Sequence, residues 1–189
     1  MGVSEVVLPR RAVPQPNPFI VSGGDCGACV YGGIFGISAK EAYERTVIAR
    51  FGKIQSICWD NMRDAFAEAE RKGTARAVTR TAHWTVDDRW CAWGAGLQAQ
   101  WQAWSTYVRM ALEAGYYGAA SVSMDGRGPE AMGPDHWVLI CGWRPSQDET
   151  ILDEVLVSCS ASHPEGCWMR IREFLQRHGG FNVLLARPA

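Results

Sequence analysis

The spacing of apolar residues changes near residue 117, and this change constrains the fold more than any other feature of the chain. Before it, apolar side chains recur at helical intervals, and the predicted helices cover about 26–35, 39–51, 61–71 and 96–114. After it, short apolar runs between turn residues predict strands over about 118–124, 136–143, 151–160 and 181–188, with one helix over about 170–178. Helices followed by strands joined as hairpins predict an α+β fold with an antiparallel sheet.

The length allows one domain with its own core. The chain has 189 residues, a size at which a core needs no disulfide or metal to hold it together. Four prolines near the N-terminus predict an extended arm over 1–21. The remainder, 22–189, is predicted to be a single domain with a helical part over about 22–116 and a sheet part over about 117–189.

Charge and composition exclude several classes of partner. The 19 basic and 20 acidic residues give a net charge of −1, so we expect no nucleic-acid partner. No stretch approaches the roughly 18 apolar residues of a membrane helix, so we expect no membrane partner. The N-terminus lacks the pattern of a secretory signal, and the seven cysteines are an odd number. These features predict reduced thiols in the cytoplasm.

The stretch "SGGDCGACVYGGIFG" (22–36) carries the strongest chemical signal. Cys26 follows a Gly-rich turn and precedes an apolar helix, and the amides of a first helical turn favour a thiolate. A thiol nucleophile also needs a nearby base. His136 opens an apolar strand directly after a Gly/Pro loop, which makes it the first candidate among the four histidines. The next strand ends in Ser158 and Cys159.

This order of residues resembles the papain-like cysteine peptidase superfamily. The likeness is greatest to the peptidase domains that remove double-glycine leader peptides on bacterial exporters, and to related stand-alone bacterial domains. It rests on "DCG" with a glycine ten residues after Cys26, on "HWVLICG" (136–142) and on "LVSCS" (156–160). The resemblance implies a papain-like fold, in which a catalytic helix in the N-terminal helical part packs on a C-terminal antiparallel sheet. It also implies a Cys nucleophile, a His base, a peptide or protein substrate, and no metal or cofactor.

Three departures from that family keep the catalytic assignment open. The leader-peptidase pattern selects Cys26 as nucleophile, whereas the papain pattern selects Cys29. The oxyanion-hole Gln, expected six residues before the nucleophile, is replaced by Ile20 or, for Cys29, by Gly23. Ser158 or Cys159 stands where the family has an Asn or Asp that orients the imidazole, and we take Ser158 as the candidate.

Nine tryptophans favour a Trp-rich core, and some of them are also candidates to line a substrate groove. We expect Trp137 and Trp101 to bind substrate, together with Gly24 just before the nucleophile. Trp90, Trp93 and Trp104 are further candidates for the groove.

Two other functions remain open beside a thiol hydrolase that cuts a peptide or amide bond. The first is a binding or structural module that kept the papain-like fold and lost turnover, because the oxyanion Gln and the orienting carboxamide are missing. The second is a zinc site, whose ligands would be Cys26, Cys29, Cys159, and either His163 or Cys167. A redox Cys-x-x-Cys pair fits less well, since such pairs follow a strand within a βαβ unit.

Overall fold

A computed structural model describes residues 4–16, 20, 25–48, 52, 57–78, 95–122, 136–146, 153–178 and 183–189. The helical elements are α1 (Cys26–Phe35), α2 (Ala39–Tyr43), the π-helical segment η1 (Glu44–Ile48), α4 (Trp59–Arg71), α5 (Ala95–Glu113) and α6 (Ile171–His178). The strands are β1 (Val6–Val7), β2 (Ala75–Val78), β3 (Tyr117–Val122), β4 (His136–Arg144), β5 (Glu154–Cys159), β6 (His163–Arg170) and β7 (Val183–Pro188). The chain is therefore α+β, as predicted.

One sheet organises the described part of the chain. Its strand order is β2-β7-β3-β4-β5-β6, with β1 pairing separately with β4, and each of these pairs is antiparallel. The predicted hairpin of β4 and β5 is confirmed, with Leu139 opposite Ser158. Neighbouring side chains on a strand point to opposite faces of a sheet, so both faces of β4 can be buried.

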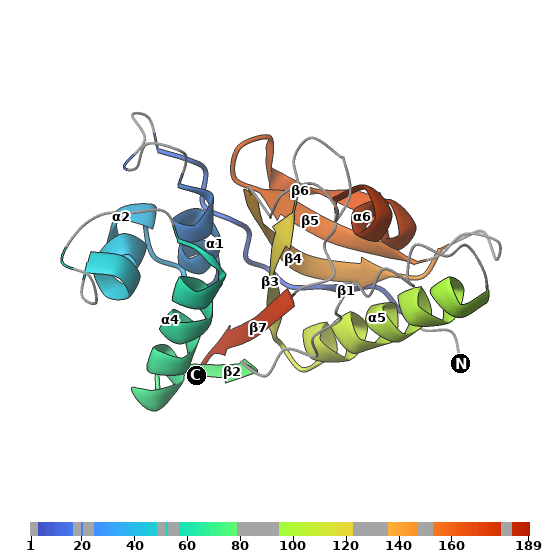
Figure 1. Cartoon of the computed structure of the whole chain (residues 1–189), viewed down its shortest axis with the longest axis horizontal. Coiled ribbons are helices and arrows are strands. Elements are labelled where there is room, and N and C mark those ends of the chain that lie inside the picture. Colours follow the sequence, from blue (N-terminus) through green and yellow to red (C-terminus); the bar gives the residue numbers. More distant parts are fainter. Residues whose placement is uncertain are drawn as a thin grey trace.

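Helices cover both faces of the sheet (Figure 1). The helices α1, α2 and α4 lie on one side, and α5 and α6 lie on the other. Alternate residues of β4 enter the two apolar cores: Trp137, Leu139 and Cys141 join the core beneath α1, whereas Val138 and Ile140 join the core beneath α5 and α6. Because β4 contributes side chains to both cores, packing on both of its faces holds this strand in place.

Local sequence signals account for the helix that begins the site. Gly36 ends α1 in the left-handed conformation, with φ of 69°, which suits a residue without a Cβ. Ser38 then caps α2, because its hydroxyl oxygen accepts a hydrogen bond from the Glu41 amide at 3.2 Å. The predicted helix over 39–51 continues through η1 to Ile48, and residues 49–51 lie outside the described ranges.

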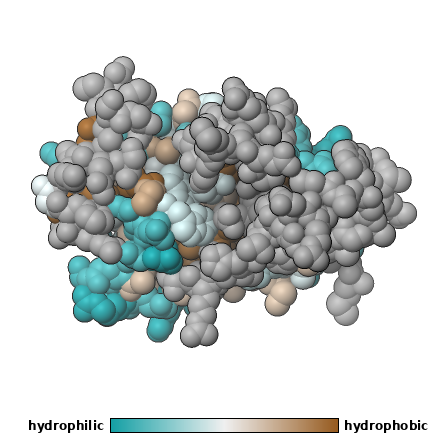
Figure 2. Space-filling view, in the orientation of Figure 1, coloured by the Kyte–Doolittle hydropathy of each residue, from teal (hydrophilic) through white to brown (hydrophobic). Residues whose placement is uncertain are grey.

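The N-terminal arm is extended and forms part of the structure. Val6 and Val7 pair with Trp143 and Gly142 of β4, and Ala12 is buried in the core beneath α1. The strand β2 lies in the stretch 75–86, whose weak alternation left a strand open within the helical part, and β6 was not predicted, because it begins at His163, which we expected in a loop. The outer face of α4 is hydrophilic (Figure 2), where Arg71 and Lys72 pair with Glu68.

Candidate active site

Asp25 fixes the start of α1, where Cys26 is the first helical residue. The Asp25 side chain is fully buried. Its carboxylate accepts hydrogen bonds from the Ile20 amide at 2.8 Å and from the Tyr43 hydroxyl at 3.0 Å. Burial and this bond to Asp25 raise the pKa of Tyr43, which keeps the phenol protonated as a donor. The buried carboxylate therefore ties α1 to α2 directly behind Cys26.

Trp137 and Ile57 pack against the first turn of α1. A Cβ at Gly27 would lie 2.7 Å from the Ile57 Cβ and 3.2 Å from a Trp137 ring carbon, so only glycine permits this approach. The indole N–H of Trp137 donates to the Ile57 carbonyl at 2.7 Å. Trp59 stacks on Trp137, with ring centroids 5.6 Å apart. The expected groove residue Trp137 thus lies beside the helix that carries the thiol.

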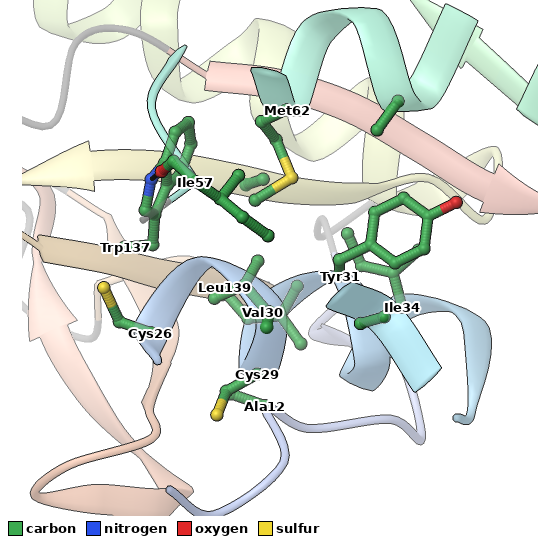
Figure 3. Close-up of a cluster of buried hydrophobic side chains, with 14 of the residues drawn as sticks. Ala12, Cys26, Cys29, Val30, Tyr31, Ile34, Ile57, Met62, Trp137 and Leu139 are labelled. Carbon is green, nitrogen blue, oxygen red and sulfur yellow. Dashed lines mark hydrogen bonds between the residues drawn. The ribbon is translucent and has the colours of Figure 1, made fainter. Parts of the chain in front are cut away.

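Figure 3 shows how Cys26 differs from the other side chains of this core. Its sulfur projects beyond the N-terminal end of α1, on the Trp137 side of the helix, whereas Val30, Ile34 and Leu139 lie among the apolar side chains. Cys26 is 9 % exposed. The thiol therefore stands at the edge of the core, where a reacting group could reach it after a small movement.

His136 lies near two sulfurs that belong to different cores of the fold. It is the first residue of β4 and is 7 % exposed. Its Nε2 lies 3.1 Å from the Cys159 sulfur, and Cys26 lies close enough to the imidazole to affect its pKa. Burial by itself lowers the pKa of His136, but the interactions with Cys159 and Cys26 raise it to about 9. The imidazole is consequently protonated at neutral pH.

Cys159 lies among hydrogen-bond donors at the turn between β5 and β6. Burial, the largest single effect, raises its pKa, and the hydrogen bond from His136 is the largest of several effects that lower it. Further bonds from the Ser162 hydroxyl and from the amides of Ala161 and Ser162 act in the same direction, and the pKa falls to about 6. Cys159 and His136 therefore form a thiolate–imidazolium pair between about pH 6 and 9.

The structure does not bring Cys29, the other candidate nucleophile, to the imidazole in the same way. Cys29 is fully buried one turn further along α1, and its sulfur lies 3.8 Å from the Pro14 carbonyl. Burial, and next the charge of Asp25, raise its pKa to about 12. Since a thiol rather than a thiolate reacts poorly, the geometry favours Cys26.

Ser158 does not orient His136, so the sequence-based assignment was one residue off. Its hydroxyl oxygen accepts a hydrogen bond from the Ala12 amide at 2.9 Å and donates to the Pro164 carbonyl at 2.7 Å. Neighbouring strand residues face opposite ways, and Cys159, next in the chain, contacts the imidazole instead. Ser158 is a structural residue that holds the N-terminal arm.

Trp101 lies away from this site, contrary to expectation. It belongs to the core beneath α5 and α6, as does Trp104, because the apolar stripe of α5 packs on the opposite face of the sheet from α1. The Arg172 guanidinium lies 5.7 Å from the Trp101 ring centroid. Gly24, Trp90 and Trp93 lie outside the described residues.

The zinc arrangement finds no support in the geometry. Within the described ranges, no group of three or more His, Cys, Asp or Glu side chains is placed to hold a metal ion. The sulfurs of Cys26 and Cys29 have different partners, as described above. His163 lies at the start of β6 with its side chain 54 % exposed, 3.5 Å from Glu165.

Comparison of the chain with family models, with curated proteins and with solved structures gives no match. The chemistry must therefore be argued from the site alone. A sulfur at a helix N-terminus and a buried imidazole are the elements of nucleophilic catalysis. The sequence pointed to both, but left the second sulfur, Cys159, as one of two alternatives at its position.

Proposed function

We propose that this protein is a thiol hydrolase of papain-like type, which cuts a peptide or amide bond with Cys26 as nucleophile and His136 as base. The observation that carries the proposal is the proximity of Cys26, at the start of α1, to His136, at the start of β4, where the Cys26 sulfur helps to raise the pKa of the imidazole. The two residues are 110 positions apart in sequence. Nucleophile and base within bonding reach are the first requirement of such a site.

The reaction would proceed through an acyl-enzyme. The Cys26 thiolate attacks the substrate carbonyl carbon, and a tetrahedral intermediate forms with the charge on oxygen. The His136 imidazolium gives its proton to the leaving amine as the carbon–nitrogen bond breaks. The imidazole, now neutral, takes a proton from water as the water oxygen attacks the thioester. The Cys26 thiolate leaves, and the imidazolium–thiolate pair is restored.

The first turn of α1 supplies charge stabilisation to this reaction. The first amides of a helix have no partner within the helix, and they carry the positive end of its dipole. Both effects favour negative charge at this turn, such as an oxyanion formed beside Cys26 during the reaction. Trp59, which is only partly buried and stacks on the buried Trp137 next to this turn, is an apolar surface for a substrate side chain.

The nature of the substrate and the location of the protein follow from the same proposal. A peptide or protein is the substrate that the resemblance implies, and the chemistry needs no metal or cofactor. The six cysteines that the structure describes are all free thiols, which supports a reducing compartment such as the cytoplasm. In the described part of the chain, no helix has the length and apolarity to cross a bilayer.

One observation favours a second function, a papain-like binding module without turnover. Ile20 occupies the position of the oxyanion Gln, and its amide donates to the Asp25 carboxylate. That backbone amide stabilises the start of α1, and the Ile20 side chain has no N–H that could replace the Gln side-chain donor to a substrate oxygen. Loss of one oxyanion donor costs about 10²–10³ in rate. A module of this kind would bind a peptide at the same site and release it unchanged.

Alkylation by iodoacetamide at pH 7 tests the hydrolase proposal. Labelling of each cysteine is followed over time by peptide mass spectrometry, for the wild type, for His136→Ala and for the control His163→Ala, whose imidazole is exposed. We expect Cys26 to react first and fast, and to slow by at least tenfold in His136→Ala only. Uniformly slow labelling of all thiols would contradict the proposal. Fast labelling without any cleavage of a peptide library would favour the binding module.

A further inference from the structure

The contacts of Cys159 make it more than a second thiol near the imidazole. It lies on the Nε2 side of His136, at 3.1 Å, while Cys26 is the other sulfur close enough to affect the pKa of the ring. Cys159 is 7 % exposed and belongs to the core beneath α5 and α6, whereas Cys26 belongs to the core beneath α1. The imidazole is thus held from both layers of the fold.

The turn after β5 is built to hold an anion at this sulfur. The Ser162 hydroxyl and the amides of Ala161 and Ser162 donate to Cys159. Together with the imidazole, these donors surround one sulfur from a tight turn, and such clusters of donors stabilise negative charge. A neutral thiol would be stabilised little by these donors, because protonated sulfur is a weak hydrogen-bond acceptor.

We infer that Cys159 is the positioning residue of this site: as a thiolate, it orients His136 and stabilises its protonated form toward Cys26. The inference rests on the proposed function and assigns the third member of the catalytic group. The sulfur anion takes the place of an oxygen from Asn or Asp. Unlike a carboxamide, it carries charge, and unlike most carboxylates, it gains a proton just below neutral pH.

Two titratable groups lie beside Cys159 and enter any pH dependence. They are His136 on β4, whose Nε2 is 3.1 Å from the sulfur, and Cys167 on β6. Burial, and next the negative charge of Cys159, raise the pKa of Cys167, so Cys167 stays protonated near neutral pH. As the pH falls through about 6, Cys159 gains a proton and the imidazolium loses its anionic partner. As the pH rises through about 9, His136 itself loses its proton.

Two variants separate the charge of Cys159 from its size. Cys159→Ser keeps the size and the hydrogen bond but does not ionise, and Cys159→Asp keeps the charge. Cys167→Ala, on the neighbouring strand, is the control. The first readout is the titration of the His136 ring followed by NMR in the full-length protein, with the signal assigned by its loss in His136→Gln. The second is the rate of Cys26 alkylation by iodoacetamide from pH 5 to 10, in which a sulfur–carbon bond forms and iodide leaves.

In Cys159→Ser we expect the pKa of His136 to fall by a unit or more and Cys26 to react about tenfold more slowly, as expected for loss of a charged hydrogen bond. In Cys159→Asp the pKa should stay near 9, and the acid limb of the alkylation profile should move below pH 6. Cys167→Ala should match the wild type. An unchanged His136 titration in Cys159→Ser overturns the inference, and so does wild-type labelling that is faster at Cys159 than at Cys26. Should Cys26 prove unreactive, the hydrolase proposal fails, while the NMR titration still decides the role of Cys159.

Discussion

Replacement of Ser158 by alanine is the sharpest test of how the site is assembled. The Ser158 hydroxyl is fully buried, and it joins the N-terminal arm to the sheet through the Ala12 amide at 2.9 Å and the Pro164 carbonyl at 2.7 Å. Ser158→Ala removes both bonds. A buried amide left without a partner costs about 1–3 kcal/mol, and an ordinary hydrogen bond contributes about 1 kcal/mol. We therefore expect the free energy of unfolding to fall by about 2–4 kcal/mol.

Equilibrium unfolding in urea measures this loss. With a denaturant slope of about 2 kcal/mol per M, the midpoint should fall by about 1–2 M. Ser38→Ala is the matched control, because it removes a serine hydrogen bond at an exposed helix cap, for which we expect about 1 kcal/mol. The rate of Cys26 alkylation in native buffer should change little in Ser158→Ala, since the hydroxyl does not touch His136.

Two results would refute this reasoning. A midpoint within 0.3 M of the wild type would mean that water replaces the lost hydroxyl, against its complete burial. A loss of Cys26 reactivity as large as in His136→Ala, with the fold intact, would mean that Ser158 does orient the imidazole. The variant therefore separates the role we expected from the sequence from the role that the contacts assign.

Two further changes test the packing behind Cys26. In Gly33→Ala, the new Cβ would lie 2.3 Å from the Arg11 carbonyl oxygen and 2.9 Å from the Ala12 Cα, and backbone cannot rotate away. We expect overpacking to cost about 1–3 kcal/mol, which exceeds the gain in helix propensity of about 1 kcal/mol. The Tm, measured by circular dichroism, should therefore fall by about 2–8 °C. An unchanged or higher Tm would contradict this reasoning. In Tyr43→Phe, the buried Asp25 carboxylate loses one donor, and urea unfolding should show a loss of about 1.5–3 kcal/mol. A loss below 0.5 kcal/mol would show that the phenol does not stabilise that carboxylate.

The sequence predicts α1 and β4 well because their signals are local. A Gly-rich turn, an apolar run and Gly36 define α1, and the run that starts at His136 defines β4. That Cys26 and His136 would meet was an inference from their order along the chain, and the structure brings them together. Both elements lie where the local pattern predicted them, as expected where each level of a fold agrees with the others.

It was harder to predict which face of the sheet a strand residue points to and which face a helix covers. The register of β5 shifts between Val157 and Cys159, and one residue of shift turns a side chain to the other face, so alternation alone could not choose between Ser158 and Cys159. The stripe of α5 correctly indicates burial of Trp101, but it does not say which face of the sheet the helix covers. The edge strand β6 contains Pro164 and Gly166, residues that are typical of turns as well as of sheet edges.

The N-terminal arm determines how the two halves of the site meet. The Val13 amide donates to the Cys29 carbonyl in α1 at 3.0 Å, and the Gln15 amide donates to the Ser160 carbonyl, next to Cys159, at 3.2 Å. The arm also passes so close to Gly33 of α1 that no side chain would fit at that position. The arm thus links the helix that carries Cys26 to the strand end that carries Cys159. Because the imidazole lies near both sulfurs, a shift of the arm would change both contacts without any change in the identity of Cys26, His136 or Cys159. The spacing of the site is therefore set by backbone contacts outside the DCG, HWVLICG and LVSCS motifs, and we expect it to be more sensitive to changes in the arm than those motifs would suggest.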